Sequence, residues 1–419
     1  EKANNDKALC RLFASVVWWI LDGVTMKFFN EYHPQNHRVI AVLAFVISAP
    51  SVVVADDRPG FYSPQFRPLE RNYYELSFNS SVIDTDSVGN STSLRCIGSE
   101  CTTAQFTSSS DMDQYGFGIT FVTPHVNRLS FGASVNYNDW SSSNSQDTWN
   151  GRMTRHDTNH DVALNLFGSY LLSDLSMVTA SLSQARSSSA NQTHRNVSFE
   201  ASSHIANNLM LSGRISALWG DKLLPNGIKH VGATLRYSET FGSLEANGSI
   251  DVHSATSISR SSVDGVATAT EKQFNGFGSG GAVYLRHDNS RFGVTASFNG
   301  NDLEGSPKNY SFGPQYIFTG SNFEFTVSGN YLVSQSDDVS RGSVLTSHSD
   351  NITKELRFGY VRDFSDGYFL TASVFRAWNS NGGSSIDTEL QSRSSIDTRV
   401  QFQSSSDNWG LNLGLMKRF

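Results

Sequence analysis

Apolar and polar residues alternate along most of the chain between residue 72 and the C-terminus. In the segment 128–138, Leu129, Phe131 and Val135 share one parity, whereas the other parity holds mainly serine, glycine and asparagine. The segments 208–219, 228–239, 243–253, 291–299 and 322–334 repeat this pattern. Because successive side chains of a strand point to opposite faces, a period of two residues indicates β-strands with one apolar and one polar face.

Sixteen segments are predicted as strands, which makes the chain all-β. They cover 72–83, 114–123, 128–138, 160–171, 176–186, 195–204, 208–219, 228–239, 243–253, 273–286, 291–299, 309–319, 322–334, 352–363, 367–378 and 408–419. Ile396, Val400 and Phe402 also alternate, but a seventeenth strand would break the alternation of short and long connections. We therefore interpret 384–405 as a hairpin from the last long connection, with about 14 or 18 strands as alternatives.

The connections alternate in length. Short turns, such as 124–127, 241–242 and 365–367, alternate along the chain with longer polar stretches at 84–111, 139–159, 254–271 and 334–351. Strands of about ten residues, apolar outside and polar inside, with this alternation are typical of a transmembrane antiparallel up-and-down β-barrel. Lipid cannot satisfy the backbone of an open sheet edge, so the sheet has to close. A soluble sandwich of this length would usually show a linker between domains, and a β-helix would show a fixed short repeat.

Composition supports this interpretation. Of 419 residues, 38% are hydrophobic, 17% charged and 12% aromatic. A disordered chain would be poorer in aromatic residues. A helical membrane protein would need several apolar runs of about 20 residues, and the sequence contains none. The net charge of −7 offers no basic face for phosphates, so we expect no nucleic-acid partner.

The N-terminal region carries a secretory signal pattern. Met26 begins a basic segment, residues 39–49 are apolar and too short for a comfortable membrane anchor, and Ala55 ends a cleavage motif. We interpret 1–25 as non-native or upstream-translated sequence, 26–55 as the signal peptide and 72–419 as the barrel. The segment 56–71 is a lead-in or a small plug, and it contains Pro59, Phe61, Tyr62, Pro64, Phe66 and Pro68.

Two cysteines remain after the signal peptide, Cys96 and Cys101. Nearby cysteines in an exported chain most often form a disulfide. A metal site is not expected from them, because the sequence has no second pair to complete four ligands.

The C-terminal strand carries Trp409, Leu411, Leu413, Leu415 and Phe419 on one face. It resembles the terminal strand of Gram-negative outer-membrane β-barrel proteins, a superfamily that includes the porins. The resemblance implies a place in the bacterial outer membrane, in contact with lipid and lipopolysaccharide. It also implies that the barrel-assembly machinery recognises Phe419, and it is compatible with a homotrimer, which is the assembly of many porins of this size.

Several charged residues have the polar parity and are predicted to line the lumen: Arg214, Arg236, Glu245, Asp251, Arg291, Glu324, Glu355 and Arg357. Their mixed sign predicts weak ion selectivity. Alternatively, they pair across strands and stabilise the wall. Strand-end aromatic residues are expected to form interfacial girdles: Tyr115, Trp140, Trp219, Tyr237, Tyr310, Tyr331, Tyr368 and Trp409. Phe167 and Phe375 have the inward parity without an evident reason.

The sequence favours a passive channel for small hydrophilic solutes, with no cofactor and no enzymatic activity. The alternative is a binding or adhesion barrel that acts through its long external loops. A third hypothesis, a barrel hydrolase, rests on His156 and His160 alone. These histidines with Asp157 and Asp161 could also hold a divalent ion, but polar loop composition explains them equally well, so no metal is expected.

Overall fold

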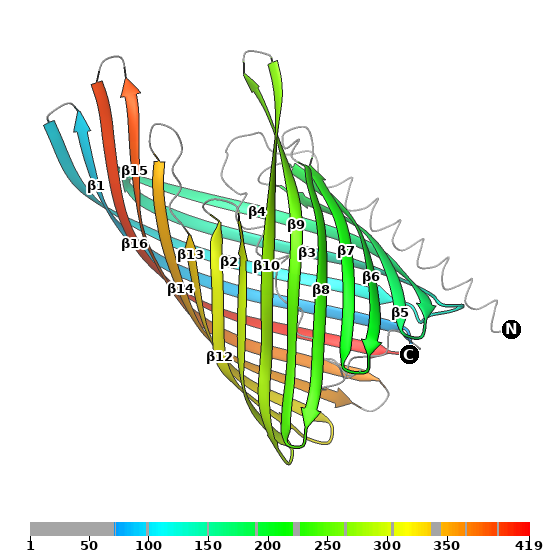
Figure 1. Cartoon of the computed structure of the whole chain (residues 1–419). Coiled ribbons are helices and arrows are strands. Elements are labelled where there is room, and N and C mark those ends of the chain that lie inside the picture. Colours follow the sequence, from blue (N-terminus) through cyan, green and yellow to red (C-terminus); the bar gives the residue numbers. More distant parts are fainter. Residues whose placement is uncertain are drawn as a thin grey trace. The chain divides into compact units, whose positions relative to one another are not determined.

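In the computed structural model, the described residues are 71, 73–97, 100–148, 151–188, 192–220, 227–263, 266–302, 306–336, 345–364, 367–391 and 394–419. They form sixteen antiparallel strands that close into one barrel, as the sequence predicts (Figure 1). The expected signal peptide at 26–55 and the lead-in before residue 71 lie outside the described residues. Among the described residues, no helix is long and apolar enough to span a membrane.

The strands follow one another around the barrel in chain order, and β16 pairs with β1. Their bounds are β1 (Glu75–Ile97), β2 (Glu100–Val122), β3 (Leu129–Thr148), β4 (Gly151–Ser173), β5 (Ser176–Ser187), β6 (Gln192–Ala206), β7 (Leu209–Gly220), β8 (Gly227–Phe241), β9 (Leu244–Val263), β10 (Val266–His287), β11 (Ser290–Asn301), β12 (Pro307–Thr319), β13 (Phe323–Ser336), β14 (Leu345–Phe364), β15 (Tyr368–Gln391) and β16 (Ser394–Arg418).

The strands extend further than predicted into three of the segments that were expected as long connections. Residues 84–111, 139–159 and 254–271 mostly continue the paired strands of β1–β2, β3–β4 and β9–β10 as long hairpins (Figure 1). Both faces of these segments carry polar residues. Apolar and polar residues therefore no longer alternate along the sequence, although the backbone stays extended. The residues 337–344 of the fourth predicted loop lie outside the described part of the chain.

Side-chain hydrogen bonds hold the extended hairpins together. The hydroxyl and the amide of Thr107 on β2 donate to Asp147 Oδ2 on β3, at 2.5 and 3.3 Å. These bonds lower the pKa of the Asp147 carboxyl.

The stretch 384–405 forms the paired ends of β15 and β16, so its interpretation as a hairpin is confirmed.

The opposite ends of the strands are joined by short turns, and we call this the short-turn end of the barrel. Gly242, Asp288 and Gly367 adopt positive φ angles there, of 62°, 50° and 76°. Glycine and aspartate tolerate this left-handed backbone better than most residues, which permits tight connections between antiparallel strands.

A disulfide joins Cys96 on β1 to Cys101 on β2 at the tip of the first hairpin. The two residues are direct cross-strand partners, with Cα atoms 4.0 Å apart.

We predict that reduction of this bond leaves the stability of the barrel nearly unchanged. The bond closes a ring much smaller than the 15-residue loop for which roughly 3 kcal/mol is expected. Urea unfolding with and without reductant measures the effect. Maleimide labelling of whole cells tests the bond, with the single-thiol variant Cys101→Ser as the control that labels at once. Labelling of the unreduced wild-type protein would show that the bond is absent.

Candidate functional site in the barrel lumen

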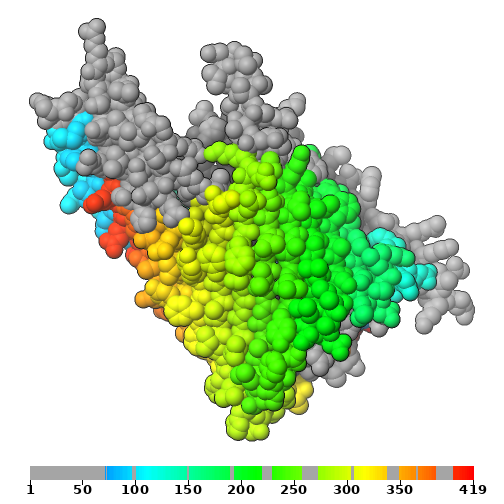
Figure 2. All heavy atoms as spheres, viewed as in Figure 1, coloured from blue at the N-terminus to red at the C-terminus, as the bar shows by residue number. Residues whose placement is uncertain are grey.

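The barrel wall has an apolar outer face and a polar inner face. Outward side chains such as Phe117, Ile215 and Val294 are large and 51–57% exposed. The residues between them on each strand, which point into the lumen, are mainly serine, threonine, asparagine and glycine. The space-filling view shows the outer wall from about β7 to β13 as a continuous surface (Figure 2).

On their strands, the eight charged residues that were predicted to line the lumen have the parity opposite to that of the exposed apolar side chains. They are Arg214 on β7, Arg236 on β8, Glu245 and Asp251 on β9, Arg291 on β11, Glu324 on β13, and Glu355 and Arg357 on β14. The structure places them in three separate groups rather than in one ring.

The first group lies at the short-turn end around a fully buried carboxylate. Glu245 is 0% exposed, and its Oε2 lies 3.1 Å from Arg291 Nε. This contact has the distance of an ion pair but not the angle of a hydrogen bond. Arg291 Nη1 also donates to Thr319 Oγ1 at 3.1 Å, and this hydroxyl donates to Glu324 Oε2 at 3.5 Å. The buried charges are therefore linked across β9, β11, β12 and β13.

The second group lies on the wall of β7 to β9. Thr234 Oγ1 donates to Asp251 Oδ1 at 2.7 Å, and Asp251 Oδ2 lies 3.1 Å from His253 Nδ1. The His253 ring centroid lies 5.1 Å from that of His230. Within the described part of the chain, Arg214 and Arg236 form no ion pair.

The third group lies on β14. Arg357 Nε donates to Glu355 Oε1 at 2.8 Å, and its guanidinium carbon lies 5.1 Å from the centroid of the Phe375 ring. The charges of this pair offset each other, so the group shapes the wall more than it contributes net charge.

Lumen-facing rings lie over glycines of the neighbouring strand, which accounts for the inward Phe167 and Phe375. A Cβ atom at Gly132 would lie 2.1 Å from the Phe167 ring, and one at Gly410 would lie 2.3 Å from the Phe375 ring. The cross-strand pairs Tyr284–Gly293 and His253–Gly276 share this arrangement. Each ring therefore lies flat against the wall, and the lumen stays wider than a standing ring would allow.

Sequence reasoning missed several inner residues that shape the site. Tyr284 is 3% exposed and donates to Gln315 Oε1 at 2.5 Å. His253 was not singled out, although it contacts both Asp251 and His230. Parity alone could have placed all of them in the lumen, but their partners depend on the register between strands.

Six of the eight aromatic residues that were predicted to form a girdle point outward, including Tyr331, which pairs with the exposed Phe312. The side chain of Trp219 lies outside the described part of the chain. Tyr115, Tyr237, Tyr310, Tyr368 and Trp409 point outward and are 37–54% exposed. Trp140 instead points inward from β3. Its direct cross-strand partners are the inward Gln114 and Asn159, and Asn159 is 1% exposed. Its assignment to the girdle was wrong.

The residues 155–161 do not form the divalent-ion site considered above. On β4, His156 and His160 point outward whereas Asp157 and Asp161 point inward. His160 Nδ1 lies 2.9 Å from Asp139 Oδ1, and Asp157 pairs with Arg155 at 2.7 Å. Four ligands cannot converge from opposite faces of one strand.

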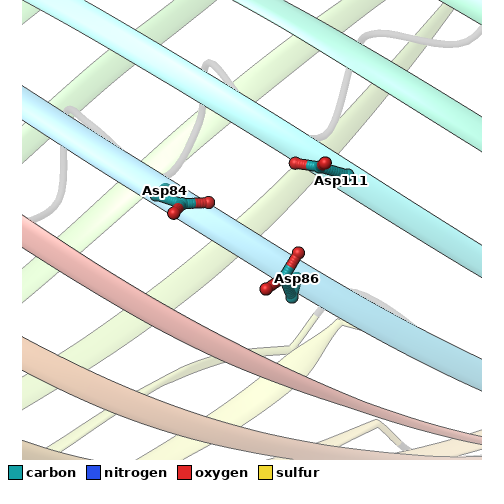
Figure 3. Close-up of side chains that lie close together, drawn as sticks. All are labelled: Asp84, Asp86 and Asp111. Atoms are coloured by element: carbon teal, nitrogen blue, oxygen red, sulfur yellow. The ribbon is translucent and has the colours of Figure 1, made fainter.

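Another carboxylate group lies on the outer face, just beyond the aromatic girdle. Asp84 and Asp86 on β1 and Asp111 on β2 each offer one oxygen within 4.8 Å of the others (Figure 3). Trp409 Nε1 donates to Asp84 Oδ2 at 2.6 Å. Carboxylates so arranged suit a hard divalent cation, but they do not face the lumen.

No protein-family model matches the sequence, and a search of curated proteins finds no match. Among solved structures, the chain is similar to OprB of Pseudomonas putida, with a TM-score of 0.40 and 8% identity over 78% of this chain and 91% of that chain. A FadL homologue of Pseudomonas aeruginosa gives a TM-score of 0.38 and 10% identity over 81% and 90%. OmpT with loop L8 deleted, an outer membrane protein of Vibrio cholerae, gives 0.29 and 12% over 80% and 99%. At these scores the likeness carries no argument about function.

Removal of the buried carboxylate should destabilise the barrel strongly. Glu245→Ala leaves Arg291, whose side chain is only 13% exposed, without its counter-charge, so we expect a loss of about 3 kcal/mol in the free energy of unfolding. Glu355→Ala breaks the more exposed pair with Arg357 and should cost about 1 kcal/mol or less. Urea unfolding in detergent compares the two variants. Equal losses would contradict the burial of Glu245.

A side chain at Gly410 should displace the Phe375 ring into the lumen. We expect Gly410→Val to cost about 1–3 kcal/mol, as overpacking usually does. The double variant Gly410→Val/Phe375→Ala should recover most of this loss, because the clashing ring is gone. Gly213→Ala, at an outward position with open space, serves as the control. Heat-modifiable migration and urea unfolding measure the effect, and a failed rescue would show that the ring is not the obstacle.

Proposed function

We propose that this protein is a bacterial outer-membrane channel through which small hydrophilic solutes diffuse without covalent chemistry. The observation that carries the proposal is the two-faced wall of a closed barrel. The exposed apolar outer face suits the hydrocarbon core of a bilayer, and only a closed barrel spans lipid with strands. The polar inner face suits water and dissolved solutes.

The charges of the lumen support weak rather than strict selectivity. Glu355 and Arg357 offset each other, and Glu245 has Arg291 beside it. Arg214 and Arg236 are the charges most available to a passing ion, whereas Glu200 lies directly opposite Arg214. We therefore propose a modest preference among ions of the two signs and no narrow filter.

Export and assembly complete the proposal. We infer that residues 26–55 direct the chain to the periplasm and that the barrel-assembly machinery recognises the strand ending in Phe419. The short turns would then face the periplasm and the long hairpins the exterior. A homotrimer within lipid and lipopolysaccharide is compatible with this placement, and crosslinking in native membranes tests it.

Planar-bilayer recording of the purified protein tests the channel. We expect discrete conductance steps, since a continuous polar lumen conducts ions. A protein that inserts and yet gives no steps at any voltage would show that the proposed function is wrong.

Two neighbouring residues of β10 provide a matched pair of variants. Gly278 points into the lumen, and Ser279 points outward. Gly278→Trp should reduce the conductance because its ring occupies lumen space, whereas Ser279→Trp should leave it unchanged. A reduction in both variants, or in neither, would contradict a solute path along this wall.

A surface-binding role is the second candidate. The paired hairpins β1–β2, β9–β10 and β15–β16 extend far beyond the girdle, and the Cys96–Cys101 disulfide fixes the tip of the first (Figure 1). Shortening these hairpins below the girdle separates the two roles. Loss of cell attachment with intact solute uptake would favour binding.

A further inference from the structure

Two histidines lie side by side on the inner face of the barrel, and we call them the histidine pair. His230 on β8 and His253 on β9 have ring centroids 5.1 Å apart. Their chain neighbours Val231 and Val252 are 58% and 49% exposed on the outer face, so both rings point into the lumen. Histidine has an ordinary pKa of about 6.5 and changes charge between about pH 5 and 8. The charge of this part of the lumen therefore depends on pH.

A glycine makes room for the pair and places an arginine beside it. Gly232 pairs directly with Arg214 of β7 on one side and with His253 on the other. A Cβ atom at Gly232 would lie 3.0 Å from His230 Cε1 and 3.2 Å from His253 Cβ. Arg214, His230 and His253 therefore lie around one position that carries no side chain, and three strands bring these basic groups together.

One carboxylate contacts the pair in the described part of the chain. Asp251 Oδ2 lies 3.1 Å from His253 Nδ1, and Asp251 Oδ1 accepts from Thr234 at 2.7 Å. The side chains of Asp251 and His253 are 42% and 18% exposed, so water in the lumen reaches both. The other direct cross-strand partners of the pair on β7, β9 and β10 are uncharged, and they are Ser216, Ala255 and Gly276. Protonation of both rings therefore adds more charge than Asp251 offsets.

The permanent charges on the inner face of β6 to β9 offset one another among the described residues. They are two arginines and two carboxylates, namely Arg214, Arg236, Glu200 and Asp251. Glu200 is the direct cross-strand partner of Arg214. Glu245, at the short-turn end of the same face, has its own counter-charge in Arg291. Neutral histidines thus leave this face without a dominant sign, and each proton that they take up makes it positive.

We propose that the inner face of β6 to β9 selects small anions in mildly acidic solution, with the histidine pair as the specificity-determining residues. The protonated pair and Arg214 form a positive surface, which concentrates anions and repels cations. His194 and His204 occupy inner positions of β6 and add to the same effect. This inference rests on the proposed channel function and names the class of solute that the channel favours.

Reversal potentials of the purified protein in planar bilayers test the selectivity. A potassium chloride gradient kept below about 0.1 M leaves a Debye length of about 10 Å or more, so charges of the wall act on passing ions. The chloride-to-potassium permeability ratio should rise about twofold or more from about pH 7.5 to about pH 5.5, where histidine titrates and unperturbed carboxylates stay ionised. The double variant His230→Asn/His253→Asn should lose about half of this rise or more, and His194 and His204 supply the rest.

Two further variants make the test specific. His156→Asn/His160→Asn, on the outer face of β4, is the matched control and should keep the whole rise. His230→Lys carries a permanent charge, so it should raise the ratio already at about pH 7.5 and reduce its further change. Heat-modifiable migration verifies that each variant folds, and His230→Lys decides the matter if the double variant does not.

The outcomes separate this inference from the proposed function. A channel whose permeability ratio does not change with pH would overturn the inference alone, and so would a full rise in the folded double variant. An unchanged ratio in His230→Lys at neutral pH would also overturn it. A wild-type protein that inserts without conductance at any pH would overturn the channel and this inference together.

Discussion

A strand in lipid has no water to complete its backbone hydrogen bonds, and this constraint decides the rest of the structure. The pairing of β1 with β16, from Glu75 and Arg418 to Ile97 and Ile396, removes the last open edge. In the closed sheet, the register between two neighbouring strands determines which residues of each strand face inward. The inward and outward positions of all strands are therefore fixed together. A slip of one residue would turn the serine-rich face to lipid.

The same closure explains the contacts inside the barrel. Residues that are distant in sequence become cross-strand partners, as Phe375 and Gly410 are. The buried Glu245 has Arg291 beside it because β9, β10 and β11 are neighbours. Charges are tolerated at the short-turn end because they are linked to one another, whereas the middle of the wall leaves Arg214 and Arg236 without ion pairs among the described residues.

Much of this arrangement could be predicted from the sequence, because a period of two is a local signal. The number of strands, their approximate positions and the assignment of the eight charged residues to the face opposite the exposed apolar side chains followed from it. The long hairpins could not be predicted. The segment 84–111 carries polar residues at both odd and even positions, so no alternation of apolar and polar residues marks it as a strand. The partners of His253 and the role of Gly132 could not be predicted either, since they depend on register between strands. Trp140 was misplaced because its residue type was weighed above its parity.

The central claim is that lipid and water contact opposite parities of each strand. Spin labels placed one at a time at positions 291–299 of β11 test it in bilayers, by collision with oxygen and with a water-soluble nickel chelate. We predict that oxygen accessibility peaks at Phe292, Val294, Ala296 and Phe298, and that nickel accessibility peaks at the residues between them. Two profiles that rise and fall together, or that show no period of two residues, would contradict the account.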